Sequence, residues 1–236
     1  MRRLSGRLPS WLVDEVPRDH RESDSAFRRR QRVVAGVSLA GAGLLGLSLQ
    51  TEPDSPEFYG LTLGVAGTWL AGGLLSGPLH LGWIRRGDAL ARPVVVPVLT
   101  GVAAFGAFYG AALVARRMPV LDRALRSVLK YAKEGSDPLV LLTTLANGAA
   151  EEVFFRGALY AAVGAGQPVT RSTAVYALAT VPTRNPALVL ASIPMGALFA
   201  LQRRASGGIQ APLITHLTWS ALMLRYLPPL FRTPAS

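Results

Sequence analysis

Long runs of apolar residues, separated by short polar segments, dominate the chain. Several of these runs reach about 20 residues, which is the length that a helix needs to cross a bilayer. Many are rich in Gly and Ala, which let helices approach one another closely in lipid. The pattern predicts an all-α fold, a polytopic transmembrane helix bundle of about 6–8 helices. The predicted helical runs are 33–49, 58–84, 94–115, 138–163, 169–181, 186–202 and 209–231.

The segment between the third and fourth runs, residues 116–137, has a different pattern. Its apolar residues recur at helical spacing, and charged residues occupy most positions between them. This pattern is typical of an amphipathic helix that lies on the membrane surface. Gly135 is expected to end this helix, and Pro138 to open the next one.

The N-terminal segment, residues 1–32, holds nine arginines and five acidic residues. It lacks the apolar core and the small-residue cleavage site of a signal peptide. We interpret it as a cytoplasmic basic tail that touches the lipid surface through RRRQR. The predicted parts of the chain are the tail 1–32, N-terminal transmembrane helices 33–115, the interfacial helix 116–137 and a membrane core 138–231.

Composition supports a membrane protein and excludes several kinds of site. Half of the residues are hydrophobic, and the net charge of +11 comes from 23 arginines and 2 lysines against 14 acids. The arginines cluster beside apolar runs, a pattern that favours lipid headgroups as partners and not nucleic acid. Because the chain has no cysteine, disulfides, thiolate catalysis and iron–sulfur clusters are excluded.

The location follows from the same features. The bias towards Arg, Ala and Gly indicates a GC-rich bacterial genome, so we predict a multi-pass protein of the bacterial cytoplasmic membrane with its N-terminus inside. Simple counting of runs then places the basic segment 116–137 outside, against the positive-inside rule. Either one upstream run does not cross the membrane fully, or the interfacial helix is an exception to the positive-inside rule.

Two carboxylates lie inside an apolar run, in the stretch NGAAEEVFFRGALY. They are Glu151 and Glu152, whereas the other acids lie in the tail or between runs. A carboxylate inside a bilayer costs several kcal/mol, so it normally faces a polar cavity and has a partner. Glu152 and Arg156 are four residues apart and can pair on one helix face. Glu151, one turn after Asn147, then remains available as a base or ligand; a purely structural Glu–Arg bridge beside a protonated glutamate is the alternative.

Histidine supplies the other candidate group. His216 lies in the last apolar run, one turn before Ser220, and His80 lies late in the second run. A single histidine inside a membrane often only joins two helices by a hydrogen bond. Beside the paired glutamates, His216 is the stronger candidate for a site residue.

These stretches resemble a known family. EEVFFRG matches the EExxxR signature of the CPBP (CAAX-processing and bacteriocin-processing, or Abi) intramembrane proteases, which include type II CAAX prenyl endopeptidases and lysostaphin-resistance-like proteins. IQAPLITHLTWS matches the last motif of that family, and the resemblance covers residues 137–227. It implies an all-helical membrane protease with its catalytic core in 138–231. Its partners would be the lipid bilayer and a membrane-associated peptide or protein, whose peptide bond it would hydrolyse.

The resemblance also implies roles for individual residues. Glu151 would activate the attacking water, Glu152 and Arg156 would shape and neutralise the site, and His216 would orient the water or stabilise the oxyanion. The family is described both as metal-dependent and as glutamate-dependent, so the cofactor stays open. If a divalent metal such as zinc is bound, Glu151 and His216 would hold it.

The sequence departs from the family pattern at two positions. Tyr176 fills the aromatic position of the middle motif, but Thr180 stands where the family has His, and Ser220 stands where it has Asn. A threonine cannot act as an imidazole base and is a poor zinc ligand. The first alternative to an endopeptidase is therefore a catalytically degenerate scaffold or immunity-type protein that binds membrane peptides. A proton-coupled transporter is a weaker alternative, because no inverted repeat is visible.

Overall fold

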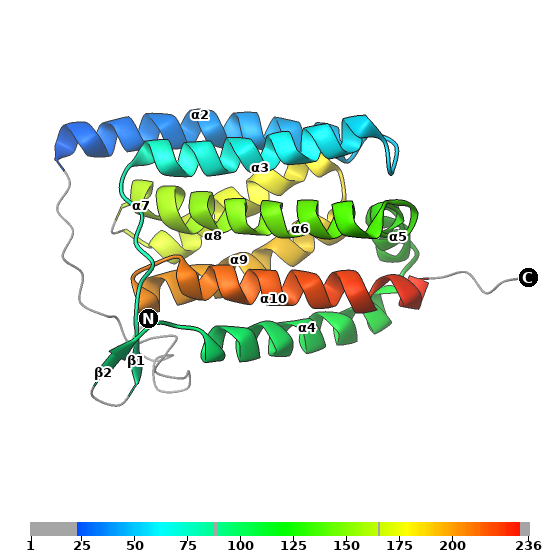
Figure 1. The fold of residues 1–236 in the computed structure, drawn as a ribbon. Coiled ribbons are helices and arrows are strands. Elements are labelled where there is room, and N and C mark those ends of the chain that lie inside the picture. The colour runs from blue at the N-terminus through cyan, green and yellow to red at the C-terminus, as the bar shows by residue number, and fades with distance from the viewer. Residues whose placement is uncertain (1–22, 87–88, 165, 232–236) are drawn as a thin grey trace, which may run out of the picture.

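The computed structural model describes residues 23–86, 89–164 and 166–231, and within them the chain is an all-α bundle, which confirms the predicted fold class (Figure 1). Residues 1–22 of the predicted tail lie outside the described residues. The four-part division of the chain stays a prediction. The helices are α2 (Asp24–Ser48), α3 (Pro56–Ser76), α4 (Val95–Ala115), α5 (Pro119–Glu134), α6 (Asp137–Glu151), α7 (Tyr160–Ala162), α8 (Pro168–Thr180), α9 (Pro186–Ser206) and α10 (Gln210–Tyr226).

Three shorter helical segments and one hairpin complete the described structure. The π-helix η1 (Glu152–Leu159) joins α6 to α7 in one continuous helical unit, and the 3₁₀ segments are η2 (Val181–Thr183) and η3 (Pro228–Phe231). Strands β1 (Ile84–Arg86) and β2 (Ala89–Ala91) pair antiparallel. The pattern of apolar runs did not predict this hairpin.

Several helices begin directly after a residue whose side chain caps the helix N-terminus. The side chain of Ser55 accepts a hydrogen bond from the backbone N–H of Phe58 at 3.0 Å, and Pro56 follows it at the first helical position. Asn185 caps α9 in the same way, ahead of Pro186. Such side chains satisfy N–H groups that have no partner within the helix, and proline loses nothing at this position.

Two predicted boundaries are wrong. The first helix begins at Asp24 and not at residue 33, because its polar first turns are helical and Ser23 caps them. The second helix ends at Ser76 and not at residue 84, since Gly77 has φ 146°, outside the range of a right-handed helix. His80 therefore lies in the segment that follows α3 and not inside a helix.

Four of the described helices, α2, α3, α4 and α9, are long and apolar enough to cross a bilayer. Helix α4 packs against α10 on one side of the bundle. Its other side exposes large apolar residues, among them Leu99 and Val114 at 63% and 62%. Such a surface is costly in water and suits contact with lipid, so these helices and the exposed apolar faces identify a membrane protein.

Helices α2 and α3 pack closely because glycines stand where they meet. A Cβ atom at Gly72 would collide with the side chain of Val37, whereas one at Gly67 of the same helix would meet nothing. This is the small-residue packing expected between membrane helices.

The same geometry gives a prediction for stability. We expect Gly72→Ala to lower the free energy of unfolding by about 1–3 kcal/mol through overpacking. Gly67→Ala is the matched control, and its better helix propensity should leave stability equal or higher by up to about 1 kcal/mol. Unfolding in detergent micelles, followed by circular dichroism, measures both; equal effects of the two variants would contradict close packing at Gly72.

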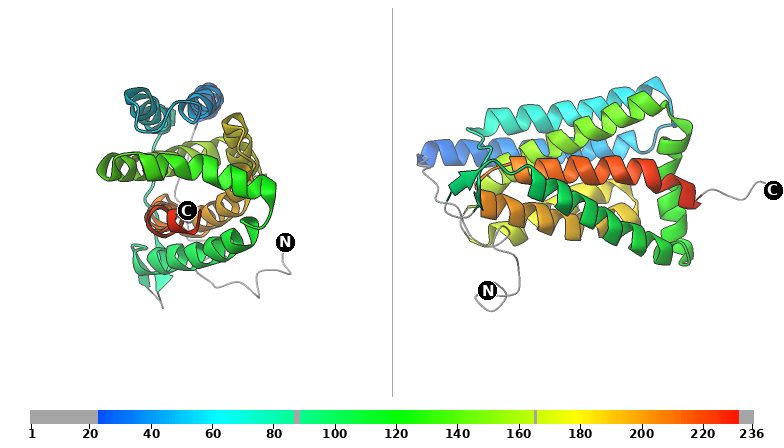
Figure 2. Two further views of the ribbon diagram at one scale, coloured as in Figure 1. Left: turned by 90° about the vertical axis from the view of Figure 1, so that its right-hand side faces the viewer. Right: turned by 60° about the horizontal axis from the view of Figure 1, so that its bottom comes forward.

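Helix α5 lies across one end of the bundle, roughly perpendicular to the other helices (Figures 1 and 2). The hydroxyl of Tyr131 donates to the carbonyl of Thr51 at 2.7 Å, and the amide of Asn185 donates to the carbonyl of Ala124 at 2.7 Å. These bonds tie α5 to the loop after α2 and to the start of α9. Burial raises the pKa of Tyr131, so its hydroxyl stays protonated and keeps donating.

The two ends of the bundle carry different sets of charged residues. The first turns of α2, the β1–β2 hairpin and the last turn of α9 lie at one end of the bundle, which we call the arginine end (Figure 1). Its described arginines include Arg28, Arg29, Arg32, Arg85, Arg92 and Arg204. Apart from Asp24, the described acids outside Glu151 and Glu152 lie at the opposite end, which we call the α5 end.

Candidate active site

The motif EEVFFRG occupies a widened turn of the bundle's central helix. The helix changes from α to π at Glu152, and all eight residues of η1 are buried. A π-helix takes more residues per turn than an α-helix, so neighbouring side chains diverge less around the axis. Such insertions are frequent at functional sites. Here the widening brings adjacent glutamates to neighbouring positions in one buried cluster.

Glu152 is the centre of a buried charged cluster. It is fully buried, and its Oε1 accepts a hydrogen bond from Arg156 Nη1 at 3.2 Å and lies 2.8 Å from His216 Nδ1. The pair with Arg156, expected from the four-residue spacing, is therefore present. Its other oxygen, Oε2, has no partner among the described residues. A buried carboxylate is stabilised only by such paired and hydrogen-bonded charges.

Arg156 is fixed by aromatic rings and by a backbone carbonyl. Its guanidinium carbon lies 4.5 Å from the ring centre of Tyr176 and 5.0 Å from that of Phe199, distances typical of cation–π contacts. Its Nη2 donates to the carbonyl of Gly196 at 3.3 Å. The cation is thus held by α8 and α9 as well as by Glu152.

Glu151 has a different environment from its neighbour. Its Oε2 accepts a 2.7 Å hydrogen bond from the hydroxyl of Tyr176 on α8. It also lines a cavity of ≈ 320 Å³ whose wall includes His216, Asn147 and Ser220. Most of the remaining wall is apolar. Glu151 therefore combines one fixed hydrogen bond with access to enclosed space, which Glu152 lacks.

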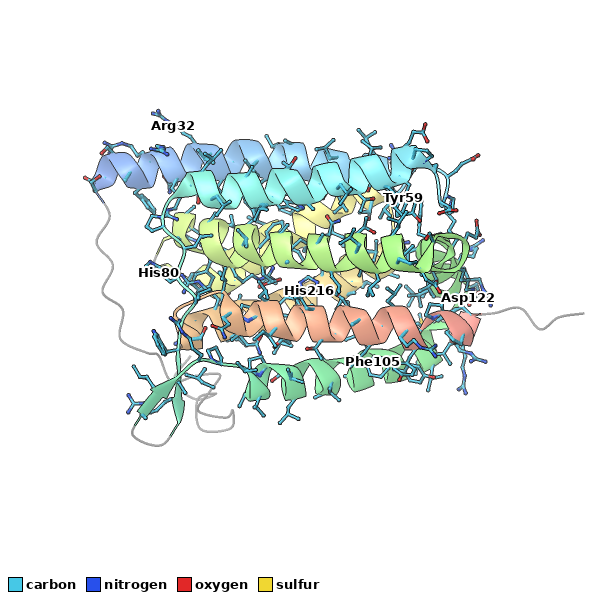
Figure 3. All side chains as sticks on the ribbon, in the orientation of Figure 1. Arg32, Tyr59, His80, Phe105, Asp122 and His216 are labelled. Atoms are coloured by element: carbon cyan, nitrogen blue, oxygen red, sulfur yellow. The ribbon has the colours of Figure 1, made fainter. Side chains whose placement is uncertain are left out.

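His216 lies in the middle of the bundle, where α10 faces α6 (Figure 3). Its ring stacks on Phe199 with centroids 4.7 Å apart. On the α6 side stands Gly148, and a Cβ atom at that glycine would come within 3.6 Å of His216 Nε2. The absence of a side chain there leaves space beside this nitrogen, while Nδ1 is occupied by Glu152.

The supporting residues fall into two groups. Tyr176, Asn147 and Ser220 adjoin the cavity or its glutamate, as described above. Asn147 donates to the backbone carbonyls of Thr62 and Thr143, each at 3.0 Å, and so joins α6 to α3. Thr180 does not line the cavity, and its hydroxyl donates back to the carbonyl of Tyr176 at 3.0 Å.

Three contacts of the site were not predicted. Phe199 and Gly196 reach the cluster from α9, and Arg203 Nε donates to the carbonyl of Arg156 at 2.7 Å. All three lie in an ordinary apolar or basic stretch of sequence, and no spacing connects them with the glutamates. His80 is exposed and does not line the cavity; Figure 3 places it near one end of the bundle, away from His216.

A catalytic zinc ion normally takes three protein ligands and an open position. Within the described ranges, no three His, Cys, Asp or Glu side chains are grouped so as to hold a metal ion. The oxygen of Glu152 nearest His216 already contacts Arg156. Glu151 and His216 alone are too few ligands, so the residues present do not fit a catalytic zinc site.

Comparison with known proteins gives one match. Residues 135–222 match the family model described as type II CAAX prenyl endopeptidase Rce1-like. The matched range contains Glu151, Glu152, Arg156 and His216. No curated protein and no solved structure matches the chain at a significant level.

Proposed function

Because residues 135–222 relate this chain to the CAAX-protease family, a typically proteolytic one, we propose that it is an intramembrane endopeptidase in which Glu151 activates a water molecule. The observation that carries the proposal is the shared cavity of Glu151 and His216, next to the buried Glu152–Arg156 pair. The substrate would be a peptide bond of a membrane-associated peptide or protein.

The contacts of Glu151 suit a general base. A base must lie within hydrogen-bond reach of the proton that it takes. Oε2 accepts from Tyr176, which fixes the orientation of the carboxylate and leaves Oε1 for a water in the cavity. Glu151 would take one proton as the water oxygen attacks the carbonyl carbon. It would return that proton to the leaving nitrogen when the C–N bond breaks, giving a carboxylate and an amine.

Glu152 would set the proton position on His216. A carboxylate can only accept, so in the 2.8 Å contact between Glu152 and Nδ1 the ring proton would stand on that nitrogen. With the single ring proton on Nδ1, Nε2 would be an acceptor beside the space left by Gly148. His216 Nε2 would therefore accept a hydrogen bond from the second proton of the attacking water and so orient the water oxygen. Ser220, which lines the same cavity, would donate a hydrogen bond from its hydroxyl to the developing oxyanion.

A comparison of membrane-peptide cleavage products between cells with wild-type protein and cells with Glu151→Gln tests the proposal and identifies substrates. We expect a set of cleaved peptides that is present only with the wild type. Identical product sets would contradict an endopeptidase with Glu151 as its base.

One observation favours the second candidate, a peptide-binding scaffold without catalysis. The position at which the resemblance expects a second imidazole is Thr180, whose hydroxyl is occupied by the carbonyl of Tyr176. On this hypothesis, wild-type protein would capture membrane peptides in a manner that depends on Glu151 but would never cleave them.

Thr180→His separates the two candidates. If Glu151 and His216 suffice, the new imidazole should raise the rate by far less than the 10²–10⁴-fold that a positioned acid–base group contributes. The rate of reporter cleavage in proteoliposomes measures this, with Ala174→His, at an exposed position of the same helix, as control. A rise of that full size would show that the natural site lacks a catalytic group and would favour the scaffold.

A further inference from the structure

Helix α9 holds the motif helix through three residues of one face. Gly196, Phe199 and Arg203 are three and four positions apart, so they lie on the same side of α9. The carbonyl of Gly196 and the ring of Phe199 contact the guanidinium of Arg156. Arg203 contacts the main chain instead, because its Nε donates to the carbonyl of Arg156 at 2.7 Å. The first two contacts fix a side chain, whereas the third fixes the backbone of η1.

The end of the π-helix creates a need for such a donor. The backbone N–H of Tyr160 donates to the carbonyl of Phe155, five residues earlier. The N–H of Val163 donates to the carbonyl of Leu159, only four residues earlier. Between these two bonds lie the three carbonyls of residues 156–158, but only two N–H groups. Each N–H supplies one donor, so one of the three carbonyls has no amide partner within the helix.

Arg203 supplies the missing donor. All residues of η1 are buried, and a buried carbonyl without a partner costs free energy. The carbonyl of Arg156, to which Arg203 donates, is one of the three. The guanidinium carbon of Arg203 also lies 5.2 Å from the ring centre of Tyr160, the first residue of α7. Arg203 is itself buried, and it contacts one residue on each side of the change from π-helix to α-helix.

The last turn of α9, which carries Arg203, has a fixed position. The backbone N–H of Trp83 donates to the carbonyl of Ser206 at 2.8 Å, so the extended segment 79–83 is bound to the end of α9. The same segment packs on η1, because a Cβ atom at Gly157 would come within 2.6 Å of Leu79 Cδ2. Figure 1 shows α7 at the arginine end, where the last turn of α9 also lies. The donor and the carbonyl are therefore held by the same neighbours.

The register of η1 decides which groups its charged side chains face. In an α-helix each residue turns further about the axis than in a π-helix. If η1 changed to an α-helix, Glu152 would turn away from His216, which it now contacts at 2.8 Å. Arg156 would likewise turn away from the ring of Tyr176, which it now contacts at 4.5 Å. A group that stabilises the π register therefore also stabilises the arrangement of the site.

We propose that Arg203 is a positioning residue of the candidate active site. Its side chain donates to the carbonyl of Arg156 in place of a helix amide, and so stabilises the π register in which Glu151 and Glu152 adjoin one cluster. The part of this proposal that concerns cleavage rests on the proposed function, whereas the part that concerns the register does not.

Two substitutions of equal length isolate the hydrogen bond. In Arg203→Gln the side-chain N–H group stands as many bonds from the backbone as Nε does in arginine, so the donor is kept. In Arg203→Met a methyl group takes that place, so the donor is lost. Both variants lack the charge and the guanidinium, and they differ from each other mainly in the donor.

A fluorotyrosine at position 176 reports the register without any assay of activity. The hydroxyl of Tyr176 donates to Glu151, and its ring contacts Phe155 and Arg156. A change of register would move these groups. By fluorine NMR in detergent micelles, we expect Arg203→Met to displace or split the wild-type resonance and Arg203→Gln to keep it.

A matched control and the opposite outcomes decide the matter. Arg126→Met removes an arginine that also donates to a backbone carbonyl, that of Phe231, but at the α5 end, and it should leave the resonance in place. A wild-type resonance in Arg203→Met protein would overturn the proposal, and so would equal displacement in both Arg203 variants. If only Arg203→Met fails to fold, the donor is required, as proposed; if neither variant folds, the donor is not sufficient and the proposal is overturned.

Kinetics test the connection with cleavage. Arg203 does not line the cavity of Glu151, so its loss should leave substrate binding intact. We expect Arg203→Met to lower kcat for a reporter peptide by roughly 10²-fold, the cost of moving reacting groups by about 1 Å, with KM within about threefold of the wild type. Arg203→Gln should retain most of kcat, and equal kcat values for the two variants would overturn the connection. A wild-type protein that cleaves nothing would contradict the proposed function and leave the fluorine result standing.

Discussion

Replacement of Glu151 by glutamine is expected to lower the rate of peptide cleavage by about 10²–10⁴-fold, the contribution of a positioned general acid–base group. Glutamine has nearly the same shape, and its side-chain oxygen can still accept the hydrogen bond of Tyr176. It cannot take a proton from water. The rate should therefore fall while the fold and the cavity stay intact.

A matched control and a stability measurement make this result specific. Glu134→Gln changes an exposed glutamate at the end of α5 and should leave the rate unchanged. Unfolding of both variants in detergent should stay within about 0.5 kcal/mol of the wild type, as for most substitutions that remove no buried contact. If Glu151→Gln protein kept more than a small fraction of the wild-type cleavage rate, Glu151 would be excluded as the base and His216 would be the remaining candidate.

Most helices were predictable because their apolar runs are long enough for a helix and have proline or glycine at or near their ends. Pro56, Pro186 and Gly135 stand at or beside helix ends, as their backbone preferences require. The end of α3 was not predictable, since Leu79, Leu81 and Trp83 continue the apolar pattern after Gly77 has turned the chain away. Hydrophobicity alone does not distinguish an apolar helix from an apolar extended segment.

The candidate site was predictable only where its residues are close in sequence. The four-residue spacing of Glu152 and Arg156 implies a contact on any helix, and the structure retains it in the π-helix. Contacts between distant helices have no such signature. The 2.8 Å contact of Glu152 with His216 spans 64 residues and depends on the packing of α10 against η1. The hydrogen bond between Tyr176 and Glu151 depends likewise on α8.

The π-helix had no signal in the sequence, and it changes the interpretation of the paired glutamates. On an α-helix, adjacent residues point about 100° apart, which predicts separate surroundings for Glu151 and Glu152. In the structure their surroundings differ in access to the cavity, but both adjoin the same cluster through Tyr176, Arg156 and His216. Glu152 contacts Arg156 and His216, whereas Glu151 lines the cavity. This difference depends on how the helices pack.

Replacement of Arg156 by leucine is expected to lower the free energy of unfolding by about 3–5 kcal/mol, because it leaves the carboxylate of Glu152 buried without its cation. Glu152 is fully buried, and only His216 Nδ1 would remain as a partner, at 2.8 Å. The carbonyl of Gly196 would also lose its donor. Unfolding by a denaturing detergent measures the loss.

A double variant separates the effect of the buried charge from that of lost packing. If the unpaired carboxylate dominates, Glu152→Gln combined with Arg156→Leu should be more stable than Arg156→Leu alone, so the two changes should not add. Arg126→Leu is the control, because that arginine forms a more exposed pair at the same spacing with Asp122 and donates one hydrogen bond to the carbonyl of Phe231, so its loss should be smaller than that of Arg156. Additive losses would instead mean that Arg156 acts mainly through its contacts with Tyr176 and Phe199, and that Glu152 is protonated in the folded protein. In that case Glu152 could donate to His216, the Nδ1 proton would no longer be required, and His216 would lose its assigned role in orienting water.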